Sequence, residues 1–342
     1  MFGYDLGIDL GTSNIAISVP GKGVVVNEPS YVAYDNETEK ILYAGRRAYY
    51  LEGREPNGVS VIQPIMNGAI TNYSLAMQMV HFFINKVIKR SIFKPRVVAC
   101  VSALATDVER RTLVSVIISA GARSVCLVEE PLCAAFGAGI DPLQPTGSFV
   151  VDIGGGTTNM AVVSQGSMSQ IDTLYTARSR FDEEITKYMR EKYGILIGKR
   201  TAEEVKRRIA CAVPREEDVV MQVKGRDLLS GMPGAAEVTG NEINACLAPL
   251  LQELTDAAAR LLERATPQLA ADIETSGIII TGGCAELYGI DKLFEQALGV
   301  KASVAPRAEL CVCKGTMIAL NKMHILDRYG YRFKTKQDVR IR

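Results

Sequence analysis

Two short segments of this chain combine an acid, glycines and hydroxyl side chains in an order suited to gripping a phosphate. In residues 149–159 an apolar run reaches Asp152 and is followed by Gly154, Gly155, Gly156, Thr157 and Thr158. Glycine lets backbone N–H groups approach an anion closely, and threonine adds a hydroxyl donor. The segment predicts a phosphate-binding hairpin, although an ordinary glycine-rich turn would have a similar composition.

The N-terminal segment repeats this arrangement. In residues 6–17 an apolar run reaches Asp9, a second apolar run returns, and between them lie Gly11, Thr12, Ser13 and Asn14. Two copies predict a duplicated domain whose two loops face one ligand. A third segment, residues 277–285, again passes from a buried strand into glycines and contains Gly282, Gly283, Cys284 and Ala285.

Composition places the chain among ordinary globular proteins and excludes several classes. It has 342 residues, of which 47% are hydrophobic and 23% charged, and its length suits two domains. A net charge of +1 creates no field that would attract nucleic acid, so we expect no nucleic-acid partner. Eight cysteines without a CxxC pair, together with two histidines, argue against zinc and for reduced thiols in the cytoplasm. Met1 leads directly into a strand, so we expect no signal peptide.

Strands alternate with helices along the chain, which predicts a mostly parallel sheet. Residues 214–240 are expected to form a small strand-rich insertion with turns at 224–226 and 232–234. The strands are expected as a meander over 6–35 and then at 95–101, 124–128, 148–153, 159–164 and 167–174. The helices are expected at 71–90, 107–120, 130–139, 181–193, 202–210 and 241–265.

The three glycine loops, in this order, resemble those of the superfamily of actins, sugar kinases and heat-shock chaperone ATPases. Strings between the loops resemble the MreB family of bacterial actins, which maintain rod shape, and the similarity runs almost end to end. The strings fall at residues 21–30, 93–98, 106–111, 128–131, 201–206, 247–250 and 266–273.

The resemblance implies an α/β, actin-like ATPase fold with two duplicated domains around a nucleotide cleft. Domain I would comprise residues 1–139 and about 314–334, with a small subdomain near 33–70. Domain II would comprise residues 140–313, with a small subdomain near 180–240.

The resemblance also implies the roles of the residues that bind ATP. Backbone and side-chain donors of Thr12, Ser13 and Asn14 would contact the β- and γ-phosphates, and Gly155, Gly156 and Thr157 would form the opposing clasp. A carboxylate beside phosphate would repel it, so Asp9 and Asp152 are expected to hold Mg²⁺ through water.

The adenosine would lie between a helix and the third loop. Glu203 and Lys206 are three residues apart and share one helix face, within the string Glu203, Glu204, Val205 and Lys206. Gly282, Gly283, Cys284 and Ala285 would lie flat against the adenine.

Glu130 is the candidate catalytic residue. It precedes Pro131 at a helix start, where a carboxylate can orient a water molecule and accept its proton, with Thr157 as its partner across the cleft. The alternative is a structural acid favoured by the helix dipole.

A protein of this family would form paired homopolymeric filaments on the inner face of the cytoplasmic membrane and guide cell-wall elongation proteins. The pair Ile92 and Phe93, with basic neighbours on both sides, would supply the membrane contact. These two side chains could instead fill the core below a strand.

Several residues depart from the family pattern. Asn67 and Asn72 replace two acids in a connecting strand expected beneath the phosphates, and Arg178 replaces a glycine near the second loop. Arg178 could clamp phosphate or point to solvent. Together these changes predict slow ATP hydrolysis, or a paralogue that acts as a scaffold. A sugar kinase would need a further substrate pocket, and a chaperone would need a peptide-binding domain.

Overall fold

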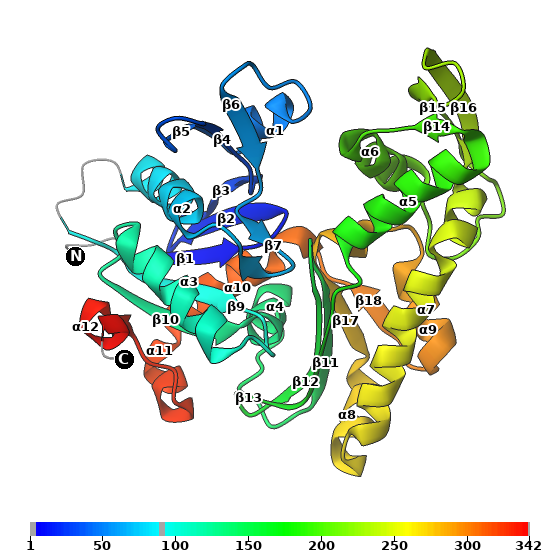
Figure 1. Ribbon diagram of the computed structural model, residues 1–342. Helices are drawn as coiled ribbons and strands as arrows, with labels where there is room; N and C mark the ends of the chain where they lie inside the picture. The colour runs from blue at the N-terminus through cyan, green and yellow to red at the C-terminus, as the bar shows by residue number, and fades with distance from the viewer. Residues whose placement is uncertain (1–4, 89–92, 341–342) are drawn as a thin grey trace.

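Two large sheets form the centre of the molecule (Figure 1). The computed structural model describes residues 5–88 and 93–340. The first sheet has the strand order β19-β10-β9-β1-β2-β3, and the second has the order β13-β12-β11-β17-β18. Each contains an antiparallel hairpin, β1–β2 or β11–β12, whose first strand also pairs in parallel with a later strand, β9 or β17. The repetition expected from the two similar motifs is therefore present in the strand pairing.

The strands of the first sheet are β1 (Asp5–Leu10), β2 (Asn14–Val19), β3 (Gly23–Pro29), β9 (Arg96–Val101), β10 (Ser124–Glu129) and β19 (Lys334–Thr335). Those of the second sheet are β11 (Ser148–Ile153), β12 (Thr158–Ser164), β13 (Ser167–Leu174), β17 (Ile278–Thr281) and β18 (Ala302–Val304).

Both faces of each large sheet are buried, as alternating side chains show. On β9, Val97 and Ala99 belong to the core under α2 (Tyr73–Val87) and α3 (Asp107–Ser119). Val98 and Cys100 belong to a different core, which lies between the two sheets. Successive strand residues point to opposite faces of the sheet. A strand that is buried on both faces therefore needs an uninterrupted run of apolar residues.

Two helices fill the space between the sheets, α4 (Glu130–Ala138) and α10 (Cys311–Asn321) (Figure 1). They cross at two glycines. A Cβ on Gly137 would lie 1.8 Å from the carbonyl oxygen of Cys311, and a Cβ on Gly315 would lie 1.7 Å from that of Cys133. Only glycine permits this separation, so the crossing fixes where Glu130 emerges at the start of α4.

Each large sheet leads into a smaller unit. The first is the sheet β5-β4-β6 with α1 (Arg46–Leu51), and the second is β14-β15-β16, flanked by α5 (Arg178–Tyr193), α6 (Lys199–Ile209) and α7 (Gly240–Arg264). Their strands are β4 (Val32–Asp35), β5 (Ile41–Ala44), β6 (Val59–Ile62), β14 (Ile195–Leu196), β15 (Val220–Asp227) and β16 (Pro233–Thr239). The remaining strands and α-helices are β7 (Ile65–Met66), β8 (Ala69–Ile70), α8 (Pro267–Ser276), α9 (Ile290–Leu298), α11 (Met323–Leu326) and α12 (Lys336–Arg340). Three short 3-10 helices lie at Gly283–Glu286, Ala308–Leu310 and Asp327–Tyr329. The domain boundaries given above stay predictions.

Some expected elements differ from the structure. The strands over 6–35 are not one meander, because β4 leaves β3 and pairs with β5 and β6. The expected turn at 224–226 is wrong, since β15 runs through it and the connection to β16 falls at 228–232. Gly225 is needed instead for close packing, because its Cβ would lie 2.5 Å from the carbonyl oxygen of Leu196. Along residues 5–88 and 93–340, no helix is long and apolar enough to cross a bilayer.

Candidate functional site

The two phosphate-type loops meet face to face. Each is closed by a backbone hydrogen bond, from Gly11 N–H to the Asn14 carbonyl (3.0 Å) in the first loop and from Gly154 N–H to the Thr157 carbonyl (2.9 Å) in the second. A Cβ on Gly155 would lie 2.3 Å from Ser13 Oγ, and one on Gly156 would lie 2.5 Å from Thr12 Oγ1. These contacts place the two loops against one another, as expected, while the ligand that they would share stays a prediction.

A short hairpin, β7–β8, lies against both loops. Its turn residues Asn67 and Gly68 have φ angles of 49° and 75°, and Gly68 N–H donates to Thr12 Oγ1 at 2.9 Å. A Cβ on Gly156 would lie 2.8 Å from Asn67 Cα, which places this turn beside the second loop too. Asn67 is therefore near the expected phosphate position, but in a turn rather than on a strand.

Asn72 lies elsewhere. It is the N-cap of α2, and its Oδ1 accepts the Leu75 N–H at 3.0 Å. The prediction that Asn72 lies on a strand beneath the phosphates is wrong, because its side chain is used to satisfy the helix terminus.

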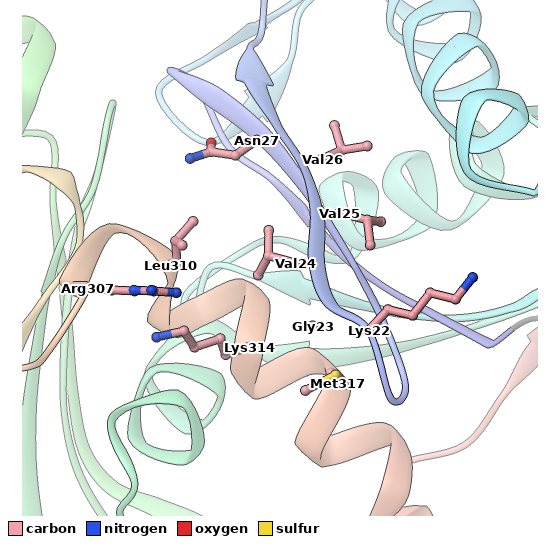
Figure 2. Close-up of a pocket in the computed structure, with 10 residues that line it drawn as sticks. All are labelled: Lys22, Gly23, Val24, Val25, Val26, Asn27, Arg307, Leu310, Lys314 and Met317. Carbon is pink, nitrogen blue, oxygen red and sulfur yellow. The ribbon is translucent and has the colours of Figure 1, made fainter.

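Asn14 directs its side chain toward the edge strand of the first sheet, where its Nδ2 donates to Asn27 Oδ1 at 2.9 Å. Asn27 lies at one end of a groove of about 520 Å³ between β3 and α10, which Figure 2 shows with Arg307 and Lys314 on its far wall. None of the residues that line this groove belongs to either loop. The side chain of Asn14 is therefore engaged with β3, and its proposed contact with phosphate stays a prediction.

Two carboxylates lie beside the loops, and of these Asp152 is buried and Asp9 is half-buried. Cys100 Sγ donates to Asp9 Oδ1 at 3.2 Å, and Thr281 Oγ1 donates to Asp152 Oδ1 at 2.6 Å. Burial raises the pKa of Asp9 to about 6 and that of Asp152 to about 7, against the opposing effect of these hydrogen bonds. Residues 5–88 and 93–340 hold no group of three or more metal-ligating side chains. Two acids without a cationic partner nevertheless fit a cation that is held through water.

Glu130 is connected to Thr157 through a residue that sequence reasoning missed. Asn159 Nδ2 donates to Glu130 Oε2 at 2.5 Å and to Thr157 Oγ1 at 3.3 Å. Burial, and then the charges of Asp152 and Asp9, raises the pKa of Glu130 well above its usual range. The signal for Asn159 was its type, because an amide within a strand that is otherwise apolar needs polar partners.

The charged residues expected near adenosine are paired within the chain. Lys206 Nζ lies 2.6 Å from Asp182 Oδ1 and 3.3 Å from the carbonyl of Arg178. The Arg178 guanidinium pairs with Glu203, whose Oε2 also accepts a 2.8 Å hydrogen bond from Tyr49 OH on α1. The Arg178 side chain is therefore directed at Glu203 rather than at solvent, and a contact with phosphate stays a prediction.

Of the four predicted residues on α6, only Glu203 and Lys206 lie on the helix face that meets Arg178 and Asp182. Glu204 is exposed and pairs with Arg208 at 2.9 Å, and Val205 is fully buried in the core beside the second sheet. Consecutive helix residues are about 100° apart, so Glu203 and Lys206 can face the site together while Glu204 and Val205 cannot. Any contact of Glu204 or Val205 with adenosine would therefore involve the backbone rather than the side chain, and their assignment to the site stays a prediction.

The third loop is built around a close backbone contact. Gly282 has φ +89°, and its Cβ would lie 2.3 Å from the Ile153 carbonyl oxygen, while a Cβ on Gly283 would meet nothing within 4 Å. Cys284 and Ala285 are buried in the core. Their side chains are thus used for packing, and the loop can offer a ligand Gly283 and its backbone.

The predicted membrane residues are only partly described. Phe93 is 52% exposed, whereas Ile92 lies outside the described residues.

Comparison with known proteins identifies the family. A family model described as MreB/Mbl protein matches residues 3–328. The chain belongs to the MreB/Mbl family. Among MreB/Mbl relatives, the cell shape-determining protein Mbl of Bacillus cereus is 40% identical over 333 residues, covering 97% of this chain and 100% of its own. The cell shape-determining protein MreB of Escherichia coli K12 is 39% identical over 336 residues, covering 96% of each chain.

Solved MreB structures have the same fold. MreB5 of Spiroplasma citri bound to ADP superposes with a TM-score of 0.90 at 34% identity, over 95% of this chain and 98% of that one. The MamK double helical filament superposes with a TM-score of 0.80 at 17% identity, over 93% of this chain and 98% of that one, which supports the fold alone. The α/β, actin-like fold and the MreB resemblance read from the sequence are both confirmed.

Proposed function

We propose that this chain binds ATP between its two glycine loops and assembles into filaments that determine cell shape. The observation that carries the proposal is the contact of Gly155 and Gly156 with Ser13 and Thr12, because two similar loops converge there on one point. The MreB5 relative has been crystallised with ADP and with AMPPNP, which supports a nucleotide in this position. The curated relatives carry the name cell shape-determining protein.

The phosphates would be held by donors on both loops. Thr12 and Ser13 contribute hydroxyl and backbone donors from one side, the backbone of Asn14 adds a further donor, and Gly155, Gly156 and Thr157 contribute from the other side. Asp9 and Asp152 would hold Mg²⁺ through water. When bound, Mg²⁺ neutralises phosphate charge, and it would relieve the repulsion between these two acids.

Adenosine would lie between α6 and the third loop. Glu203 and Lys206 face this region together, and Gly283 leaves room for a flat base. Arg178 holds Glu203 from the start of α5, so in this chain the ribose side of the site is preorganised by an ion pair.

Glu130 would support hydrolysis. It orients water and accepts its proton as the water oxygen bonds to the γ-phosphorus and the bond to the bridging oxygen breaks, leaving ADP and phosphate. The raised pKa of Glu130 reduces the fraction of carboxylate able to accept that proton, which favours slow turnover. A nucleotide-binding scaffold with impaired hydrolysis is the second candidate, and this same pKa shift favours it.

The filaments would be homopolymers on the inner face of the cytoplasmic membrane, where they would guide cell-wall elongation proteins. Exposed Phe93, adjoining Ile92 and several basic residues, supports contact with anionic lipid.

Equilibrium titration with a fluorescent ATP analogue tests the binding site. Gly156→Ala adds a methyl group that would meet Thr12 and the Asn67 backbone, whereas Gly198→Ala adds the same group where nothing lies within 4 Å. We expect saturable binding to the unmodified chain and to Gly198→Ala, and an affinity about tenfold weaker for Gly156→Ala, which is roughly 1.4 kcal/mol. The absence of saturable binding, or an unaltered affinity in Gly156→Ala, would refute the proposed site.

A further inference from the structure

Asn159 is a fully buried amide whose four hydrogen-bonding positions are all used. Its Nδ2 donates to Glu130 Oε2 and to Thr157 Oγ1, at 2.5 and 3.3 Å. Its Oδ1 accepts from Ser102 Oγ and Thr173 Oγ1, at 2.8 and 2.9 Å. A side-chain amide has two donors and two acceptor lone pairs, so this one is completely satisfied.

The partners of Asn159 determine which way its amide faces. The Ser102 and Thr173 hydroxyls can both donate, whereas an ionised Glu130 can only accept. Rotating the amide by 180° would place its oxygen against the Glu130 carboxylate and its NH₂ group against two hydroxyls. The hydroxyl pair therefore keeps the donor end of Asn159 directed at Glu130.

The surroundings of Glu130 are otherwise acidic or neutral. Asp9 approaches from β1, Asp152 from β11, Cys100 from β9 and Cys133 from α4 itself. Along the described part of the chain, Asn159 is the only side chain that donates a hydrogen bond to Glu130, and no side chain donates to Glu130 Oε1.

We propose that Asn159 is a positioning residue for Glu130: it holds Oε2 and leaves Oε1 as the oxygen that receives the proton of the attacking water. The inference rests on the proposed hydrolytic role of Glu130. Asn159 does not touch the reacting atoms, and it acts through the orientation and the ionisation of Glu130. A hydrogen bond to the charged form of an acid favours that form. Asn159 therefore lowers the pKa of Glu130, whereas burial raises it.

Phosphate release from Mg²⁺–ATP, measured from pH 6 to 9, tests this inference. Asn159→Asp keeps the shape but replaces the donor by a second acid. The substitution should raise the pKa of Glu130 further, and each pKa unit means about tenfold less carboxylate below that pKa. We expect turnover at pH 7 to fall by about tenfold or more, with partial recovery at high pH and ATP affinity changed by less than about twofold. Asn57→Asp makes the same chemical change in an exposed turn and should leave the profile unchanged.

Thr173→Val and Ser102→Ala provide a test that adds no charge. Each removes one hydroxyl that orients the amide, and we expect each to lower turnover about threefold to tenfold while ATP affinity is retained. If Asn159→Asp does not fold, these two variants decide the question.

The outcomes separate this inference from the proposed function. If the unmodified chain turns over ATP, Glu130→Gln abolishes turnover, and Asn159→Asp retains the normal rate and pH profile, the role of Asn159 is overturned. The same conclusion holds if Asn159→Asp lowers turnover equally at every pH, because a purely structural defect would do so. If Glu130→Gln leaves turnover unchanged, the hydrolytic part of the proposed function itself fails.

Discussion

The charged side chains around the two loops and α6 form two groups with different chemistry. Beside the two loops, Asp152 is buried, Asp9 and Glu130 are half-buried, and each of the three has a raised pKa. On the adenosine side, acids and bases are paired, as in Arg178 with Glu203 and Lys206 with Asp182. The proposed cation would compensate the charge of the first group, whereas the second group is paired within the chain itself.

Removing Arg178 should loosen the adenosine side. Its guanidinium and Tyr49 OH both hold Glu203, and this links α5, α6 and α1. We expect Arg178→Ala to release a fluorescent ADP analogue several-fold faster in a stopped-flow displacement experiment. Arg180→Ala is the matched control, because Arg180 makes an i,i+3 pair with Glu183 in which both side chains are more than half exposed. Equal release rates for the two variants would show that the Arg178 pair does not restrain the nucleotide.

The acids with raised pKa values predict how stability changes with pH in protein free of nucleotide and metal. Folding raises the pKa of Asp152 from 3.8 to about 7 and that of Asp9 from 3.8 to about 6. At a pH between the unfolded and folded values, the folded chain therefore binds more protons than the unfolded chain. Unfolding free energy should therefore fall as pH rises from 5 to 7.5. Acids with lowered pKa values, such as Asp227, lose their stabilising effect only below this window.

Thermal melting in EDTA measures this dependence. We expect Tm to fall by about 5 °C between pH 5.5 and 7.5, and the isosteric Asp152→Asn to reduce that fall. A Tm that rises across the window would contradict the assigned shifts.

At the scale of elements, regular patterns were predictable and specific side-chain partners were not. Strand–acid–glycine motifs identified both loops, because a buried strand and a tight turn have strong local sequence preferences. Asn72 and Gly225 were misread, since a helix cap and a close backbone approach depend on neighbours that only the fold provides. Asn159 and the Arg178–Glu203 pair were missed for the same reason: their partners are distant in sequence.

The cap at the start of α2 gives a test of the corrected role of Asn72. Asn72→Ala removes the acceptor for Leu75 N–H and should lower the free energy of unfolding by about 1 kcal/mol, measured by urea denaturation. Asn72→Asp retains a capping oxygen and should be as stable as the unmodified chain. If Asn72→Asp instead accelerates ATP turnover, Asn72 would belong to the phosphate site after all.

At the scale of the whole molecule, two sheets are held against the same pair of helices. The crossing of α4 and α10 at Gly137 and Gly315 fixes Glu130 relative to both sheets, and Asn159 reaches it from the second one. Phe93 is half exposed and lies just before the start of β9, whereas Cys100, which contacts Asp9, lies near the end of that strand. Nucleotide binding and membrane contact should therefore be separable by mutation.

Liposome pelleting tests that separation. We expect the double variant Ile92→Ser, Phe93→Ser to lose binding to anionic vesicles while it still binds ATP, because the apolar contribution to insertion is removed. Leu229→Ser, at a fully exposed position between β15 and β16, is the matched control and should pellet normally. Unchanged pelleting of the double variant would place the membrane contact elsewhere.

Electron microscopy of the purified chain on lipid monolayers tests the central claim most directly. After removal of bound nucleotide with EDTA, we expect filaments when ATP or AMPPNP is added with Mg²⁺, none without nucleotide, and none from Gly156→Ala at the same concentrations. Filaments that form equally well without nucleotide, or no filaments under any of these conditions, would contradict the proposal that this chain is an ATP-dependent filament protein.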